Sequence, residues 1–182
     1  MKKLLDRIFI DGLGGMAQGL FATLIIGTII QQIGLFMGGG TGDLIYELGK
    51  IAAGLTGAGI GVGVARKLEA GHLVIVSAAV VGMIGAFAGK ILSGQVLVDG
   101  NLVLAGPGEP LGAFAAAYLV IEIGIFISGK TKLDIILTPL VCIGTGSAVG
   151  LFVGPPISEF MLWLGSLINW GTEQQPFLMG IV

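Results

Sequence analysis

Glu122 is the residue whose position in this chain most strongly suggests chemistry. It lies between two isoleucines, past the midpoint of an apolar stretch over residues 111–128. A carboxylate at such a depth in a membrane costs at least about 2.5 kcal/mol unless it is paired, hydrated or protonated. Two interpretations follow. Glu122 lines a cavity and binds a solute or a proton, or it forms a structural pair with Lys130, Lys132 or a hydroxyl group.

Asp134, Thr138 and Pro139 lie where the next apolar stretch begins, over residues 135–153. An aspartate at a helix start accepts hydrogen bonds from the first-turn N–H groups, so Asp134 suits a cap. Pro139 removes one backbone hydrogen bond, and the Thr138 hydroxyl could bridge the freed backbone. Kinked segments inside a membrane usually face protein or water, which makes these residues candidates for solute binding as well.

Two further glutamates, Glu109 and Glu159, follow segments rich in glycine and proline. Glu109 ends the loop Gly106-Pro107-Gly108, which is either a plain loop or an outer gate. Glu159 follows Pro155-Pro156 and either caps a short helix or lines a pore. We count both glutamates among the candidate solute-binding residues.

Other chemistry is excluded by what the chain lacks. His72 is the only histidine and Cys142 the only cysteine. A histidine-pair metal site, a catalytic site that needs a second histidine and an intrachain disulfide therefore cannot form. We predict that the chain is not an enzyme and has no cofactor.

The composition indicates which elements must position these residues. Of 182 residues, 54% are hydrophobic and 11% charged, and the mean hydropathy is +1.01. Soluble domains carry about 25% charged residues. The net charge of −2 offers no basic surface for a nucleic acid. The 34 glycines instead suit an all-α polytopic membrane protein, in which glycine lets helices approach closely.

Five apolar stretches are long enough to cross the bilayer, given that a span needs about 20 apolar residues. They cover residues 14–36, 43–65, 73–92, 111–128 and 135–153 of a single membrane domain over 1–182. Residues 1–12 form an amphipathic surface helix. Gly154-Pro155-Pro156 is expected to stop the fifth span, so that residues 157–170 form a short re-entrant or interfacial helix.

Two local patterns complete the expected architecture. Residues 95–104 alternate between apolar and polar, which predicts a β-hairpin centred on Asp99-Gly100 or Gly100-Asn101. Small residues recur at helical spacing, as at Gly57 and Gly61 and at Gly82 and Ala86. Such repeats predict tight helix packing. The alternative is that they expose backbone carbonyls to a solute path.

The cationic residues orient the chain in the membrane. If the N-terminus is cytoplasmic, seven of the nine Lys and Arg residues lie on the cytoplasmic side, as the positive-inside rule requires. These are Lys2, Lys3, Arg7, Arg66, Lys67, Lys130 and Lys132. We therefore expect a cytoplasmic N-terminus.

Several segments resemble the phosphotransferase-system EIIC-like family of integral membrane proteins, which also contains regulators of toxin expression. The most specific are GKTKLDIILTPLV at residues 129–141 and VGPPI at residues 153–157. LGSLIN at residues 164–169, QPFLMGI at residues 175–181 and the glycine-rich stretch ending GVGVARKL also fit. Family members continue with further spans after QPFLMGI, so the chain resembles their N-terminal half.

The resemblance implies a sugar permease subunit in a bacterial cytoplasmic membrane, with soluble phosphotransferase subunits as partners. The bilayer and a sugar or another small polar solute are the other expected partners, and a homo-oligomer could complete the pathway between chains. Two alternatives stay open. One is a membrane-embedded regulator or sensor without transport, and the other is an oligomeric channel.

Overall fold

The first helix of the computed structural model, which describes residues 5–174, is longer than the expected span. Four consecutive segments form one helix that passes residue 13 without a break. They are η1 (Arg7–Gly12), α2 (Leu13–Leu20), η2 (Phe21–Ile25) and α3 (Ile26–Met37), and the η segments are π-helical. The surface helix expected over residues 1–12 is therefore not separate from the first span. The helix continues through Gly12, which packs on Phe114 and Tyr118. Residues 1–4 of it, with Lys2 and Lys3, lie outside the described residues.

The second span is a pair of bent helices. α4 (Gly39–Gly54) returns beside α3 after a turn at Gly38, whose φ of 62° suits glycine. α5 (Thr56–Lys67) follows after a break at Leu55, and the two helices are bent by 48°. The span expected at residues 43–65 therefore begins at Gly39 and is broken near its middle.

α6 (His72–Leu92) and α7 (Pro110–Ile127) lie close to their expected boundaries, and a small hairpin joins them. Strands β1 (Leu97–Val98) and β2 (Asn101–Leu102) pair antiparallel, with Leu97 opposite Leu102. Asp99 and Gly100 form the turn with φ of 50° and 77°. Two positive φ values are the mark of a type I′ turn, so the prediction with Asp99-Gly100 at the centre is confirmed.

The last helix corrects one expectation. α8 (Asp134–Gln174) continues through Pro139, Pro155 and Pro156, so residues 154–156 do not stop it. Each proline removes only one N–H donor and keeps a helical φ. Glycine contacts at this point also hold α8 against α6. A Cβ added at Gly150 would lie 3.4 Å from Gly85 Cα, and one added at Gly154 would collide with the Ala88 side chain. At 41 residues, α8 is about 61 Å long, twice what a bilayer needs.

Glycines hold the central bundle of α2, α5, α6, α7 and α8 together. A Cβ added at Gly57 would lie 2.6 Å from the Gly82 carbonyl oxygen, and one added at Gly85 would lie 2.6 Å from that of Gly112. The tight packing predicted from the glycine spacing is therefore confirmed. Large side chains such as Phe87 and Ile121 fill the remaining core.

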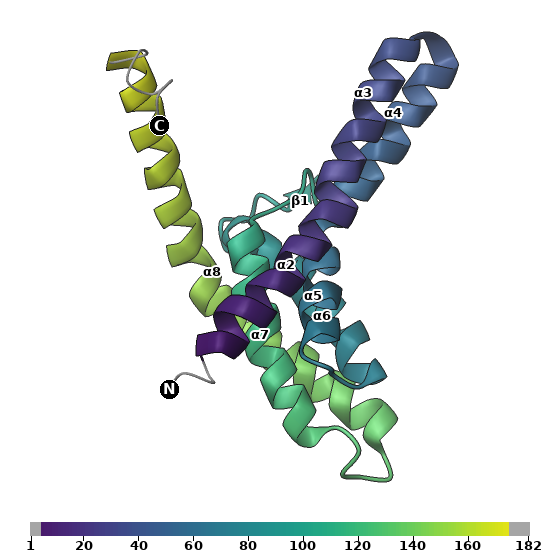
Figure 1. Ribbon diagram of the computed structural model, residues 1–182, viewed down its shortest axis with the longest axis vertical. Coiled ribbons are helices and arrows are strands. Elements are labelled where there is room, and N and C mark those ends of the chain that lie inside the picture. The colour runs from purple at the N-terminus through teal and green to yellow at the C-terminus, as the bar shows by residue number, and fades with distance from the viewer. Residues whose placement is uncertain (1–4, 175–182) are drawn as a thin grey trace.

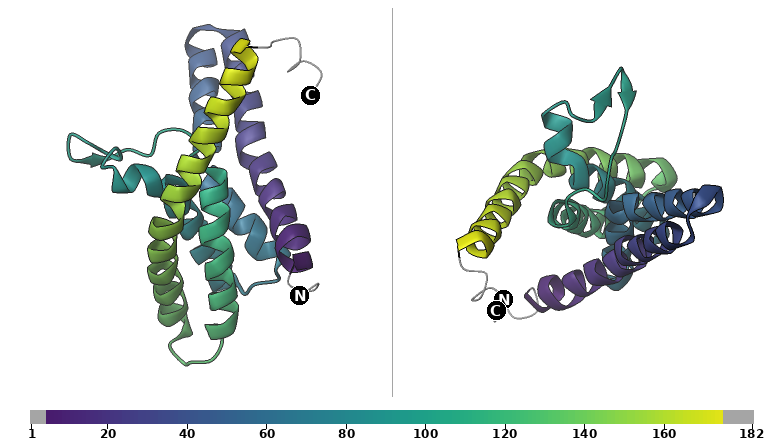
Figure 2. Two further views of the ribbon diagram at one scale, coloured as in Figure 1. Left: turned by 90° about the vertical axis from the view of Figure 1, so that its left-hand side faces the viewer. Right: turned by 90° about the horizontal axis from the view of Figure 1, so that it is seen from above.

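Beyond the bundle, the α3–α4 hairpin and the C-terminal half of α8 extend as two separate arms on the same side (Figures 1 and 2). Both arms expose large apolar side chains, among them Ile29, Ile33, Phe36, Leu44, Phe160, Leu162, Trp163 and Trp170. Within residues 5–174, four helices are long and apolar enough to cross a membrane, or five if the α4–α5 pair counts as one span. The chain is thus an integral membrane protein, and its all-helical architecture is as predicted.

Candidate functional site

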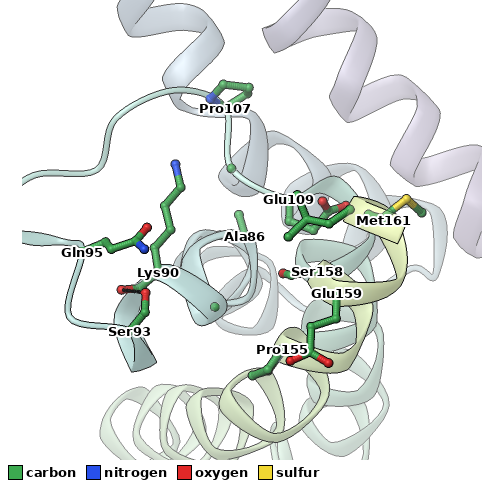
Figure 3. A pocket seen from close by; sticks show the side chains of 13 residues that line it. Ala86, Lys90, Ser93, Gln95, Pro107, Glu109, Pro155, Ser158, Glu159 and Met161 are labelled. Atoms are coloured by element: carbon green, nitrogen blue, oxygen red, sulfur yellow. Dashed lines mark hydrogen bonds between the residues drawn. The ribbon is translucent and has the colours of Figure 1, made fainter. Parts of the chain in front are cut away.

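A cavity of 660 Å³, lined by both apolar and polar side chains, lies where the end of α6, the loop before α7 and the middle of α8 meet (Figure 3). This volume is in the range of pockets that hold small molecules. Its polar side chains come from three parts of the chain that are far apart in the sequence. They are Lys90, Ser93 and Gln95 after and within α6, Glu109 before α7, and Ser158 and Glu159 on α8.

Close backbone contacts position the loop that forms one wall of the cavity. The Glu109 N–H donates to the Ala86 carbonyl oxygen at 2.7 Å. Gly108 has a φ of 73°, and a Cβ there would lie 2.7 Å from the Ala86 side chain. Only glycine therefore fits between this loop and α6. The loop is thereby fixed over the C-terminal end of α6, with Glu109 facing the cavity.

Glu109 is held by the helix that it precedes. Its carboxylate accepts a hydrogen bond from the Leu111 N–H at 3.3 Å, and Pro110 follows as the first helical residue. The N-terminal end of a helix carries partial positive charge, which favours an ionised carboxylate. Glu109 is thus the N-cap of α7 as well as a wall of the cavity.

Lys90 lies on the other side of the cavity, together with Ser93 and Gln95 (Figure 3). Its ammonium group donates to the Ala105 carbonyl oxygen at 3.2 Å and lies 5.5 Å from the centre of the Phe87 ring. A carbonyl oxygen and an aromatic face both stabilise a cation. The cavity therefore has a cationic side and, at Glu109 and Glu159, an anionic side.

Ser158 and Glu159 reach the cavity because α8 continues past Pro155 and Pro156. A Cβ added at Gly89 would lie 3.2 Å from the Ser158 hydroxyl oxygen, so α6 and α8 approach closely below the cavity. Glu159 forms no hydrogen bond or ion pair with any residue whose side chain the structure describes. The cavity thus contains a carboxylate without a protein partner in the described part of the chain.

The candidate site residues separate into two groups. Glu109 and Glu159 both line the cavity. Glu122 lies elsewhere and pairs with Arg7, with Nε 2.6 Å from Oε1 and Nη2 3.4 Å from Oε2. The structural-pair interpretation of Glu122 fits this geometry, although with Arg7 in place of Lys130 or Lys132.

Asp134, Thr138 and Pro139 also lie away from the cavity, at the turn where α7 ends and α8 begins. The Asp134 carboxylate accepts hydrogen bonds from the Thr138 hydroxyl at 2.6 Å and from the Gly129 N–H at 2.9 Å. Thr138 is fully buried. The carboxylate therefore closes the turn before α8 and anchors a side chain four residues into the helix, and its N–H donor, Gly129, precedes the helix instead of lying in its first turn.

The Arg7–Glu122 pair is expected to stabilise the contact between the first helix and α7. Arg7→Gln and Glu122→Gln should each lower the thermal unfolding midpoint in detergent. The double variant should lose less than the sum, with a coupling of about 1 kcal/mol. The exposed Glu47–Lys50 pair, at 3.3 Å, is the control and should show weaker coupling. Additive effects of Arg7→Gln and Glu122→Gln would show that the pair has no energetic role.

The sequence did not point to Lys90, Ser93, Gln95 or Ser158 as site residues. Lys90 lies near the end of an apolar stretch, and the three others are ordinary polar residues. Ser158 stands beside Glu159 after the two prolines, which is the one local signal that could have drawn attention to it.

Comparisons with known proteins give one match. A family model described as "Phosphotransferase system, EIIC" matches residues 10–182. No curated protein and no solved structure matches the chain.

Proposed function

The chain belongs to the phosphotransferase system EIIC family, and we propose that it is a permease subunit that binds and translocates a sugar or another small polar solute. The observation that carries the proposal is the 660 Å³ cavity, which combines hydroxyl, amide, ammonium and carboxylate groups within a strongly apolar chain. Such groups can hydrogen-bond the hydroxyls of a sugar, and ionisable residues within membrane proteins commonly mark substrate or ion pathways.

The topology supports an outward-facing entrance. With the N-terminus in the cytoplasm, α6 runs outward, so its C-terminal end and the cavity lie toward the outer side. The short turn after α7, which carries Lys130 and Lys132, then lies in the cytoplasm. In this arrangement the solute enters at the cavity and leaves toward soluble phosphotransferase subunits in the cytoplasm of a bacterium.

The pair of prolines within α8 marks the part of the chain that we expect to move. Pro155 and Pro156 leave two backbone carbonyls one turn earlier without their helical donors, and Pro155 itself lines the cavity. Broken or bent helices beside a solute site are the elements that shift during alternating access. We therefore expect the part of α8 beyond Pro156 to move against α6 and α7, with a second copy of the chain completing the pathway.

Reconstituted protein tests the proposal. Proteoliposomes that contain the chain should take up radiolabelled glucose or glucosamine in a saturable manner, and protein-free liposomes should not. Saturable binding in detergent without any uptake would contradict translocation and favour the membrane regulator. Uptake that rises linearly with concentration, without saturation, would favour the channel.

A further inference from the structure

The charges in the cavity are unequal. Among the described residues that line it, Lys90 is the only cation, whereas Glu109 and Glu159 supply two carboxylates. Lys90 lies across the cavity from both (Figure 3). Its ammonium already contacts the Ala105 carbonyl oxygen and the Phe87 ring, so it is held on its own side. The carboxylate side therefore lacks a matching positive charge.

The two carboxylates differ in how well they are satisfied. Glu109 accepts the Leu111 N–H and lies at the positive end of α7. Glu159 has no partner among the side chains that the structure describes. Its side chain is exposed at the cavity, next to the exposed apolar residues Phe160 and Leu162. A solute that enters the cavity therefore covers a carboxylate that no described protein group neutralises, so a positive charge on the solute would stabilise binding.

We infer that the solute carries a protonated amino group, which pairs with Glu159, and hydroxyl groups, which bond to Ser158, Ser93 and Gln95. This inference rests on the proposed function and narrows its substrate class to amino sugars and similar polyhydroxy amines. A neutral sugar would remove water from the Glu159 carboxylate and return no charge. An ammonium group on the solute compensates for the water that the Glu159 carboxylate loses, because it forms a charge-assisted hydrogen bond with that carboxylate.

A binding assay with three sugars tests the inference. Glucosamine carries the charge at neutral pH, N-acetylglucosamine has the same skeleton without it, and glucose has a hydroxyl group in its place. The purified wild-type chain in detergent should bind glucosamine about tenfold more tightly than either neutral sugar, since one charged hydrogen bond is worth at least about that factor. Equal affinity for all three would overturn the inference and leave the proposed function intact. If none of them binds, the proposed function fails together with the inference.

Variants of Glu159 test whether this residue causes the preference for glucosamine. Glu159→Gln should remove the preference for glucosamine over N-acetylglucosamine, whereas Glu159→Asp should retain the preference. Glu69→Gln, at an exposed carboxylate beyond the end of α5, is the matched control and should behave as wild type. Size-exclusion profiles verify that each variant is folded. A preference that survives Glu159→Gln would contradict the assignment.

A free inorganic cation is the other group that could supply a positive charge to pair with Glu159. Glucose titrations in sodium chloride and in caesium chloride of equal ionic strength separate the two sources. Affinities that are the same in both salts agree with an amino group on the solute. Glucose binding that requires sodium would show that the cation is an inorganic ion and would overturn the inference.

Discussion

Replacing Gly82 with alanine is expected to prevent the bundle from folding stably. A Cβ at this position would collide with the Gly57 carbonyl oxygen and lie 3.1 Å from its carbonyl carbon. Both atoms belong to the backbone of α5, so no side chain can turn aside. Overpacking a core usually costs about 1–3 kcal/mol. A methyl group forced against the backbone should cost at least about 3 kcal/mol, because α5 and α6 must then separate. Denaturant titration in detergent gives the free energy of unfolding of each variant and so measures this loss of stability.

Gly144→Ala provides the matched control. Gly144 lies in α8 and is exposed, and nothing lies within 4 Å of a Cβ added there. Alanine is favoured over glycine inside a helix by about 1 kcal/mol, so this variant should be at least as stable as wild type. If Gly82→Ala were as stable as Gly144→Ala, this result would contradict the close packing of α5 on α6 at Gly57 and Gly82.

Much of the fold was predictable because it depends on local patterns. The apolar stretches gave the number of long helices, and the alternation around Asp99-Gly100 gave the hairpin and its turn. The small-residue repeats gave the packing faces. Each of these features is set by residues close together in the sequence, where hydropathy, turn chemistry and glycine spacing act directly.

The course of the chain through its prolines was not predictable in the same way. Pro155 and Pro156 suggested a helix end, because proline removes a donor and crowds the preceding turn. In the structure, Gly150 and Gly154 pack α8 on α6 and hold the helix together across both prolines. This tertiary contact overrides the local preference, and no local pattern shows that α8 meets α6 there.

The site shows the same limit. Glu109 and Glu159 were identified as single residues by their glycine–proline surroundings, but only the fold brings them to one cavity with Lys90. Arg7 and Glu122 are 115 residues apart in the sequence, so their ion pair could not be read from spacing. Carboxylates inside apolar stretches can be found from the sequence, whereas their partners depend on which helices pack together.

The account depends on the cavity at Ser158 being filled with water and open to solute. Cys142 is the only cysteine and is fully buried, so a Cys142→Ser background allows single cysteines to be placed at will. The measurement is the rate at which a positively charged methanethiosulfonate modifies Ser158→Cys in proteoliposomes, compared with Thr138→Cys at a fully buried position.

We predict rapid modification of Ser158→Cys, because a hydrated thiol ionises and reacts. The attached cation should then block the cavity and abolish uptake, while Thr138→Cys should stay unmodified and active. If Ser158→Cys reacts no faster than Thr138→Cys, this part of α8 faces lipid or protein, and the cavity is not the solute site.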